Sequence, residues 1–269
     1  HYGASPIMAG AVNKSITVGD CKGDCEIFYE LGLRCMPINF EKYKDYSDFL
    51  ADYRLAYKRT FEELREEVVH QKTETLSYRK YETGKLRPDG KPGFNTPTGR
   101  IEFYSTLFQA YGYDPLPYIE EPGIGPVSTP DLYEEYPLVL MTGARSKVFF
   151  HTEHRQIEAL RQFDKEPHVQ IGRKFARENG IEQDDWVWIE NPRGRCKMRA
   201  TVDDHCASDR ALAPHGWWFP EQDGNGDNPY GVLDSNVNLL LHNAPSVYGF
   251  GSDIRCTLCK IYKVKEGEM

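Results

Sequence analysis

The sequence predicts an α+β protein that is mainly β-structure in its C-terminal half, where a small closed barrel follows a smaller helical and α/β segment. Up to about residue 130, helical patterns alternate with polar stretches rich in Gly and Pro. Beyond it, short apolar runs follow one another closely and are separated by tight turns, as in a small barrel. We therefore expect two parts, residues 1–130 and residues 131–269.

The N-terminal part carries two helical patterns. Residues 26–33 form a short amphipathic pattern, and apolar side chains recur at mostly helical spacing over residues 46–70. The many Gly and Pro residues between positions 83 and 99 predict a loop. A short strand over residues 100–104 and a linker over residues 120–126 are expected to follow.

The C-terminal part carries several strand patterns and one helical pattern. A short helix is expected over residues 173–179, because Gly180 follows it as a helix-ending residue. The strands expected over residues 185–190 and 195–202 form a hairpin. The second of them alternates apolar and cationic side chains, which predicts that one face is in water. The expected strands cover residues 137–142, 168–171, 185–190, 195–202, 211–214 and 257–264.

The composition excludes several classes of protein. With 33 basic and 41 acidic residues, the net charge of −8 argues against broad electrostatic binding to nucleic acid. No apolar stretch is long enough to cross a bilayer, which argues against direct membrane insertion, and the 13% aromatic content argues against intrinsic disorder. Seven cysteines are too few for a disulfide scaffold, so reduced thiols are expected. The chain begins at His1 without a signal-peptide pattern, and we expect a processed product or a piece of a longer protein.

One candidate ligand site follows the strand that ends at Thr142. A strand ending in Thr-Gly lets the backbone approach a ligand closely, because Gly lacks a Cβ atom and adopts unusual φ values. Backbone N–H groups beyond such a turn, with a nearby Arg, suit phosphate or carboxylate oxygens. An ordinary strand-to-helix turn is the alternative. The residues concerned are Thr142, Gly143, Ala144, Arg145 and Ser146.

Two later segments are further candidates. His215 and Gly216 precede three consecutive aromatic residues, which form either a wall for a planar ligand or a loop packed over the core. Asn236 and Asn238 carry both donors and acceptors, which suit the edge of an amide-like heterocycle, although Asn is also common in turns.

Three patterns suggest metal sites but are weaker. His151 and His154 could chelate a metal from one helix face, yet no Cys or acidic pattern accompanies them. Residues 223–228 resemble a calcium loop without its required Gly, so a solvated turn is expected. Cys256 and Cys259 have a metal-ligand spacing, but they face opposite sides of a strand and are expected to be mostly buried thiols.

Together these segments resemble one family. Residues 93–105, GFNTPTGRIEFYS, are similar to a signature of the molybdopterin oxidoreductases, the dimethyl sulfoxide reductase superfamily. Further similar segments follow in the family's order over nearly the whole chain: residues 112–117, 142–152, 176–194, 215–218 and 236–239. The resemblance implies a double-psi β-barrel that binds molybdopterin dinucleotide, preceded by the tail of an α/β domain and a connector.

The resemblance also implies what the site binds. Members of this family hold molybdopterin guanine dinucleotide around a molybdenum or tungsten ion, and an iron–sulfur cluster lies in an N-terminal part that is not recognisable here. The metal would be held outside this chain, which is expected to be inactive alone. The implied partners are the rest of the same polypeptide and an iron–sulfur electron-transfer subunit. The residues expected to bind the cofactor are Thr142, Gly143, Ala144, Arg145, Ser146, His151, Thr152, His215, Gly216, Trp217, Asn236, Asn238 and Arg255.

The reaction expected of the complete enzyme is two-electron redox chemistry, as in anaerobic respiration. A non-redox hydratase or hydroxyltransferase of the same family stays open as an alternative. So do a stand-alone barrel that binds a peptide or protein and a purely structural domain. The sequence indicates neither the substrate nor the compartment.

The assignment of Asn238 gives a first prediction. Asn238→Ala is expected to reduce cofactor retention more than Cys256→Ala, because only the amide is assigned a hydrogen bond to the cofactor. Guanine nucleotide released from the purified, denatured protein measures the retention. Equal cofactor content in the two variants would count against the assignment.

Overall fold

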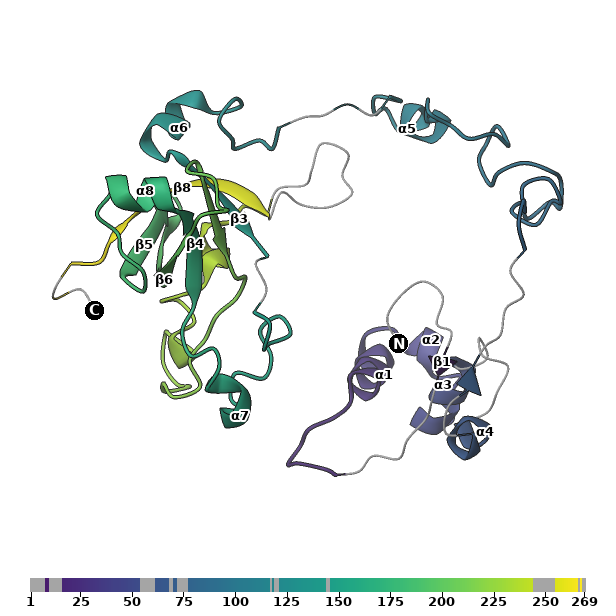
Figure 1. Cartoon of the computed structure of the whole chain (residues 1–269). Coiled ribbons are helices and arrows are strands. Elements are labelled where there is room, and N and C mark those ends of the chain that lie inside the picture. The colour runs from purple at the N-terminus through teal and green to yellow at the C-terminus, as the bar shows by residue number, and fades with distance from the viewer. Residues whose placement is uncertain are drawn as a thin grey trace. The chain divides into compact units, whose positions relative to one another are not determined.

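The computed structural model describes residues 8–9, 16–53, 61–67, 70–71, 77–116, 118, 121–143, 146–243, 255–265 and 267 (Figure 1). Contacts divide the chain into two compact units, His1–Arg100 and Ile101–Met269. The boundary expected at residue 130 stays a prediction. A search of the described helices finds none with the length and apolar character needed to cross a membrane.

The first unit is mainly helical. Its elements are β1 (Met8–Ala9), α1 (Asp24–Cys35), α2 (Pro37–Phe40), α3 (Tyr46–Tyr53), α4 (Phe61–Glu66) and β2 (His70–Gln71), and β1 pairs antiparallel with β2. Tyr29 of α1 is buried and stacks on Phe49 of α3 with ring centroids 5.2 Å apart. Gly32 lets α1 approach α2 closely, because an added Cβ would lie 2.4 Å from the Phe40 ring.

The helical predictions for this unit are confirmed in part. The pattern at residues 26–33 is part of the longer α1. The pattern at residues 46–70 forms α3 and α4, but its last residue belongs to β2, and residues 54–60 lie outside the described residues. Residues 83–99 are turns and bends, as predicted.

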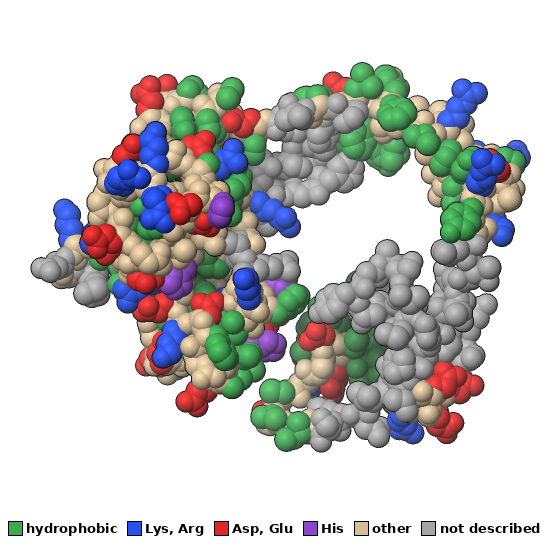
Figure 2. Space-filling view, viewed as in Figure 1, with side chains coloured by type: hydrophobic (Ala, Val, Ile, Leu, Met, Phe, Trp, Pro, Cys, Tyr) green, Lys and Arg blue, Asp and Glu red, His purple; other side chains and the backbone are tan. Residues whose placement is uncertain are grey.

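The strand predicted at residues 100–104 is wrong. Residues 100–104 form bends and irregular backbone, and the side chain of Glu102 accepts hydrogen bonds from the backbone N–H and the hydroxyl of Thr106 at the start of α5 (Thr106–Ala110). Ser105 caps that helix by accepting from Phe108 N at 3.1 Å. Phe103 is 82% exposed, and apolar side chains cover much of the surface of this region (Figure 2). The apolar pattern therefore belongs to an exposed, irregular segment before a helix rather than to a buried strand.

The second unit contains a closed, six-stranded barrel. Its strands follow the order β3-β7-β4-β6-β5-β8 around the barrel, and β8 pairs with β3 to close it. Two pairs are parallel, β3 with β7 and β4 with β6, and the other pairs are antiparallel. This confirms the predicted barrel. The strands are β3 (Leu138–Thr142), β4 (His168–Gly172), β5 (Trp186–Asn191), β6 (Gly194–Asp203), β7 (Arg210–Ala213) and β8 (Cys256–Lys263).

Alternating side chains explain why these residues form a barrel. Along β5, every second residue from Val187 to Asn191 is buried, while the residues between them are half-buried. On the outer face, the guanidinium groups of Arg195 and Arg199 lie 4.1 and 4.5 Å from the rings of Trp188 and Trp186. The fully buried core consists mainly of Leu138, Leu140, Val169, Ile171, Val187, Ile189, Cys196, Met198, Ala200, Ala211, Ala213, Val237, Leu240 and Cys259.

Short helices connect the strands. They are α6 (Pro130–Glu135), α7 (Glu158–Arg161), α8 (Arg173–Glu178), η2 (Pro229–Gly231) and η3 (Val237–Leu240). Figure 1 shows α7 beyond one end of the barrel and α8 at the opposite end. Positive and negative side chains are interspersed over the surface of this unit (Figure 2).

The seven cysteines, all among the described residues, form no disulfide. Cys196 and Cys259 are fully buried in the barrel, whereas Cys256 is half-buried at the start of β8. Burial raises the pKa of the Cys196 thiol to about 12 and also raises the pKa of Cys259. Both buried thiols therefore act as small apolar core residues.

The barrel core gives a prediction about stability. Leu140→Ala should lower the free energy of unfolding by about 2–5 kcal/mol, because it leaves a cavity at a fully buried position. All four Trp residues lie in the second unit, so Trp fluorescence during urea denaturation reports on the unfolding of that unit. Val127→Ala, at a position 80% exposed, is the control and should change stability by no more than about 0.5 kcal/mol. Equal effects of the two changes would contradict the assigned core.

Candidate functional site

The parallel pairing of β3 with β7 brings two distant loops together. Thr142 at the end of β3 pairs with Ala213 at the end of β7, so both strands end at the same edge of the barrel. The described parts of residues 143–157, here called the first loop, and residues 214–222, the second loop, therefore leave the barrel side by side. Arg255 is at the same edge, because its carbonyl oxygen accepts a hydrogen bond from Thr142 N at 2.9 Å.

Two histidines join the loops. Nδ1 of His151 lies 2.7 Å from Nε2 of His215, within hydrogen-bonding distance, and both side chains are half-buried. His151 has a left-handed backbone with φ of 51°, which a residue other than Gly rarely adopts. Such conformations persist where surrounding contacts hold them, and they are concentrated at functional sites.

Thr152 and Gly216 make a second contact between the loops. Gly216 has φ of +59°, and an added Cβ would lie 2.4 Å from Cγ2 of Thr152. The indole N–H of Trp218 donates to the carbonyl oxygen of Thr152 at 2.7 Å. Gly is therefore needed at position 216 both for its backbone conformation and for this close approach.

Arg155 makes the third contact and is 1% exposed. Its Nη1 donates to the carbonyl oxygen of His151 at 3.3 Å, and its Nη2 donates to that of Gly216 at 3.1 Å. The guanidinium carbon lies 4.2 Å from the ring centroid of Trp217 and 5.2 Å from that of Phe149. Burial lowers the pKa of Arg155 to about 10, so the side chain stays charged at neutral pH.

The aromatic residues of the second loop form a small core of their own. Trp217 and Phe219 pack with Phe149, and all three are buried, with Val148 and Leu160 packed against them. Trp218 is half-buried. The loops are thus supported by an apolar cluster separate from the barrel core, which makes them a rigid platform rather than loose connections.

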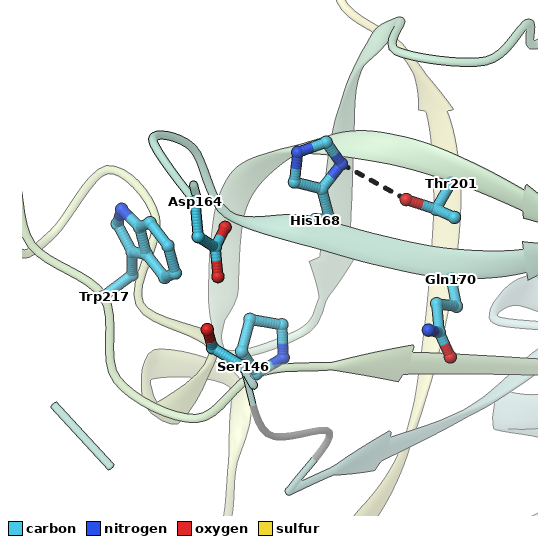
Figure 3. A pocket seen from close by; sticks show the side chains of 7 residues that line it. Ser146, Asp164, His168, Gln170, Thr201 and Trp217 are labelled. Carbon is cyan, nitrogen blue, oxygen red and sulfur yellow. Dashed lines mark hydrogen bonds between the residues drawn. The ribbon is translucent and has the colours of Figure 1, made fainter. Parts of the chain in front are cut away.

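A pocket lies beside this platform. It has a volume of about 120 Å³ and is lined by Ser146, Asp164, His168, Gln170, Thr201, Pro214 and Trp217. Figure 3 shows the carboxylate of Asp164 between Trp217 and His168, and Nδ1 of His168 lies 3.2 Å from the hydroxyl oxygen of Thr201. Ser146 is already engaged, since its Oγ accepts from the backbone N–H groups of Val148 and Phe149. The pocket therefore combines an aromatic wall with hydrogen-bonding groups, a lining that suits a small polar molecule.

The structure brings most of the predicted cofactor residues to one place. Thr142, Gly143, Ser146, His151, Thr152, His215, Gly216, Trp217 and Arg255 lie on or beside the two loops, at the edge where β3 and β7 end. Ala144 and Arg145 lie outside the described residues. The binding role of each residue stays a prediction.

Asn236 and Asn238 lie at η3. Asn236 caps η3 by accepting a hydrogen bond from Asn238 N at 3.1 Å, and η3 packs against β6. The buried amide of Asn191 donates to the carbonyl oxygen of Leu240 in the same region. Among the described residues, no recorded hydrogen bond links either Asn to the two loops.

No group of three or more His, Cys, Asp or Glu side chains suited to a metal ion occurs in the described part of the chain. His154 is exposed, while its predicted metal partner His151 contacts His215 instead. In the calcium-like segment, Asp223 accepts hydrogen bonds from the backbone and side chain of Asn225 within a turn. This arrangement is that of the expected solvated turn.

Sequence reasoning missed Arg155 and five residues of the pocket: Asp164, His168, Gln170, Thr201 and Pro214. Arg155 directly follows the His151–His154 segment that was singled out, so its position was the available signal. His168 and Gln170 are the half-buried residues of β4, where they alternate with buried Val169 and Ile171. Polar residues at these alternate positions were a signal that the outer face of the strand carries a site.

Comparisons with known proteins identify the barrel. Residues 138–248 match the family model described as the molydopterin dinucleotide binding domain. The chain is 37% identical over 209 residues to dopamine dehydroxylase from Eggerthella lenta, covering 70% of this chain and 20% of that protein. It is 35% identical over 156 residues to acetylene hydratase from Syntrophotalea acetylenica, covering 58% of this chain and 20% of that protein. The chain thus spans about a fifth of the length of these curated relatives.

A solved structure is similar over most of the chain. Acetylene hydratase from Pelobacter acetylenicus superposes with a TM-score of 0.74 and 28% identity, covering 91% of this chain and 33% of the hydratase chain. The resemblance inferred from the sequence motifs is confirmed.

Gly216 gives a prediction about the contact between the loops. Gly216→Ala should lower the free energy of unfolding by about 1–3 kcal/mol, because it combines a left-handed backbone with a clash against Thr152. Adding Thr152→Ser removes the clashing methyl group and should restore part of the loss, as measured by Trp fluorescence during urea denaturation.

Gly143→Ala is the matched control, because φ is also positive at +102° but no atom of the described residues lies within 4 Å of an added Cβ. Thr152→Ser should not relieve Gly143→Ala. If Thr152→Ser relieved neither variant, the close approach of Gly216 to Thr152 would be wrong.

Proposed function

We propose that the two loops hold molybdopterin guanine dinucleotide, because the chain belongs to the molybdopterin oxidoreductases of the dimethyl sulfoxide reductase superfamily. It is a C-terminal part of such a protein and contains the dinucleotide-binding domain. In the full-length enzyme this cofactor, with a molybdenum or tungsten ion, supplies two-electron redox chemistry. The observation that carries the proposal is the edge at which β3 and β7 end, where His151, Thr152, His215 and Gly216 are held together.

The residues present fit such a group. A cofactor with a diphosphate and a polar heterocycle needs close access to the backbone and several hydrogen-bonding groups. Gly143 supplies the access, since it has φ of +102° and no atom of the described residues lies within 4 Å of where a Cβ would be. His151 and His215 supply imidazole nitrogens in the same two loops, and Arg255, whose backbone bonds to Thr142 at this edge, is a cationic residue. The buried indole N–H of Trp217 has no hydrogen-bond partner among the described residues, and such an orphaned donor beside a pocket is a feature of ligand sites.

The roles of this chain are to bind and to orient. Gly143 and the residues after it would contact the diphosphate, with Arg255 compensating its charge. His151, Thr152 and His215 would hydrogen-bond the heterocycle, and the pocket beside Trp217 offers a second set of polar contacts. Asn236 and Asn238 would hydrogen-bond the pterin or the guanine from their positions at η3. The rest of the polypeptide would hold the metal and an iron–sulfur cluster, and an iron–sulfur subunit would deliver electrons.

The relatives support two classes of reaction. Dopamine dehydroxylase, by its name, removes a hydroxyl group, and replacing hydroxyl by hydrogen consumes two electrons. Acetylene hydratase, by its name, adds water, which changes no net oxidation state. The longer match to the dehydroxylase supports redox chemistry as the main proposal, and the structural match to the hydratase supports a non-redox reaction as the alternative.

A cofactor analysis tests the proposal. The full-length protein, produced and purified anaerobically, should contain guanine nucleotide and molybdenum or tungsten. Replacing both His151 and His215 by Gln should lower the guanine content severalfold, because each loses its contact to the heterocycle. His205→Gln, at an exposed site outside the loops, should leave it unchanged. Finding neither nucleotide nor metal in well-folded protein would reject the proposal.

The two reaction classes differ in their need for electrons. A redox enzyme should oxidise reduced viologen when given its substrate, for which dopamine and related catechols are the first to test. A hydratase should convert acetylene without net consumption of an electron donor. Donor-independent turnover as the only activity would favour the alternative.

A further inference from the structure

The guanidinium of Arg155 is buried at the point where the two loops meet. It is 1% exposed and makes no recorded ion pair among the described residues. Burying a charge without an ion-pair partner has a large desolvation free energy, so a buried Arg needs other contacts that compensate for its lost hydration. Here those contacts are two carbonyl oxygens and two aromatic faces.

The two carbonyl groups belong to opposite loops. One is the carbonyl of His151, in the first loop, and the other is the carbonyl of Gly216, which follows His215 in the second. A guanidinium carries its N–H donors in a rigid planar fork, so holding both carbonyls at once fixes their separation. That separation in turn sets the distance between the imidazole rings of His151 and His215, whose centroids are 5.0 Å apart.

The histidine pair depends on this distance. Only one proton fits between Nδ1 of His151 and Nε2 of His215 at 2.7 Å, so one ring donates and the other accepts. The tautomers of the two rings are therefore coupled. The pair behaves as one unit only while the loops keep the two nitrogen atoms within hydrogen-bonding distance. The left-handed backbone of His151 would relax without a contact that holds its carbonyl group.

The other charged groups near Arg155 make no recorded hydrogen bond to the carbonyl group of His151 among the described residues. Asp164 and Glu153 are acidic groups close enough to stabilise the charge of Arg155, and Arg161 is a cation close enough to oppose it. Arg161, the last residue of α7, also contacts the second loop, since its Nη2 lies 2.7 Å from a carboxylate oxygen of Glu221. Arg161 follows His151 by ten residues and its partner Glu221 follows His215 by six, and the Arg161 guanidinium lies 5.8 Å from the ring of Phe219.

We propose that Arg155 is a positioning residue, which holds His151 and His215 as a single hydrogen-bonded unit at the cofactor site. This inference rests on the proposed function for the identity of the ligand, but the effect on the histidines is independent of it. Arg155 itself does not contact the cofactor. It acts through the two carbonyl groups it holds.

Chemical modification of the histidines tests the proposal directly. Diethyl pyrocarbonate reacts with neutral imidazole nitrogen, and mass spectrometry of the peptides gives a rate for each histidine. The experiment uses full-length protein made in cells that cannot synthesise molybdopterin, so the cofactor cannot shield the site. Arg155→Met should raise the rates at His151 and His215 about fivefold, which corresponds to losing one hydrogen bond of ordinary net strength. Exposed His205 should be unchanged.

Two further variants control the result. Arg161→Met removes the arginine that joins α7 to the second loop and should leave both histidine rates as in the wild type. Arg155→Lys cannot hold two carbonyl groups in a fixed plane and should give intermediate rates. Wild-type rates in Arg155→Met, or an equal rise in Arg161→Met, would overturn the proposal. If Arg155→Met does not fold, Arg155→Lys decides, and wild-type rates in it would overturn the proposal.

Cofactor content of the same variants, prepared with cofactor, completes the test. Arg155→Met should retain less guanine nucleotide than Arg161→Met. Equal retention, despite faster histidine modification, would overturn the role at the cofactor site. Absence of cofactor from the wild type would instead reject the proposed function and leave the histidine result standing.

Discussion

The parallel pairing of β3 with β7 is the constraint on which the candidate site depends. Residues 142 and 213 are far apart in the sequence, yet the register places them opposite each other at one edge of the barrel. The loops that follow must then share the same space. Every contact described between them, through His151, Gly216 or Arg155, is possible only because both strands run in the same direction and end together.

The barrel could be predicted from the sequence because its signal is local. In β5 and β6, alternation of buried and half-buried side chains repeats over several residues, and the turn between them begins at Asn191. The segment at residues 100–104 carried a similar apolar alternation, but Glu102 bonds to Thr106 four residues later. A side chain that accepts a hydrogen bond from a nearby backbone N–H group can change the secondary structure of a short segment. Hydrophobic periodicity gives no information about such a hydrogen bond.

The site was predictable where a glycine or an aromatic run marked it, as at Gly143 and Trp217. Arg155 could not be predicted in the same way. An arginine in a polar segment is normally a surface residue, and its burial here depends on Trp217 and Gly216, which lie in the other loop. The pairing of His151 with His215 is equally non-local. Asn236 and Asn238 were selected for their chemistry, and their place on η3 follows from packing against β6, which no spacing in the sequence encodes.

The closure of the barrel by β8 has a consequence for how the chain is made. β3 is the first strand of the barrel to leave the ribosome, but Leu138 finds its partner Cys259 only when the last strand has been synthesised. Until then the growing chain carries an unpaired edge and an open apolar interior, and contacts this distant in sequence form slowly. During that interval the edges of β3 and β5 that later receive β8 are open to mispairing, and a chaperone that binds extended apolar strands would protect them.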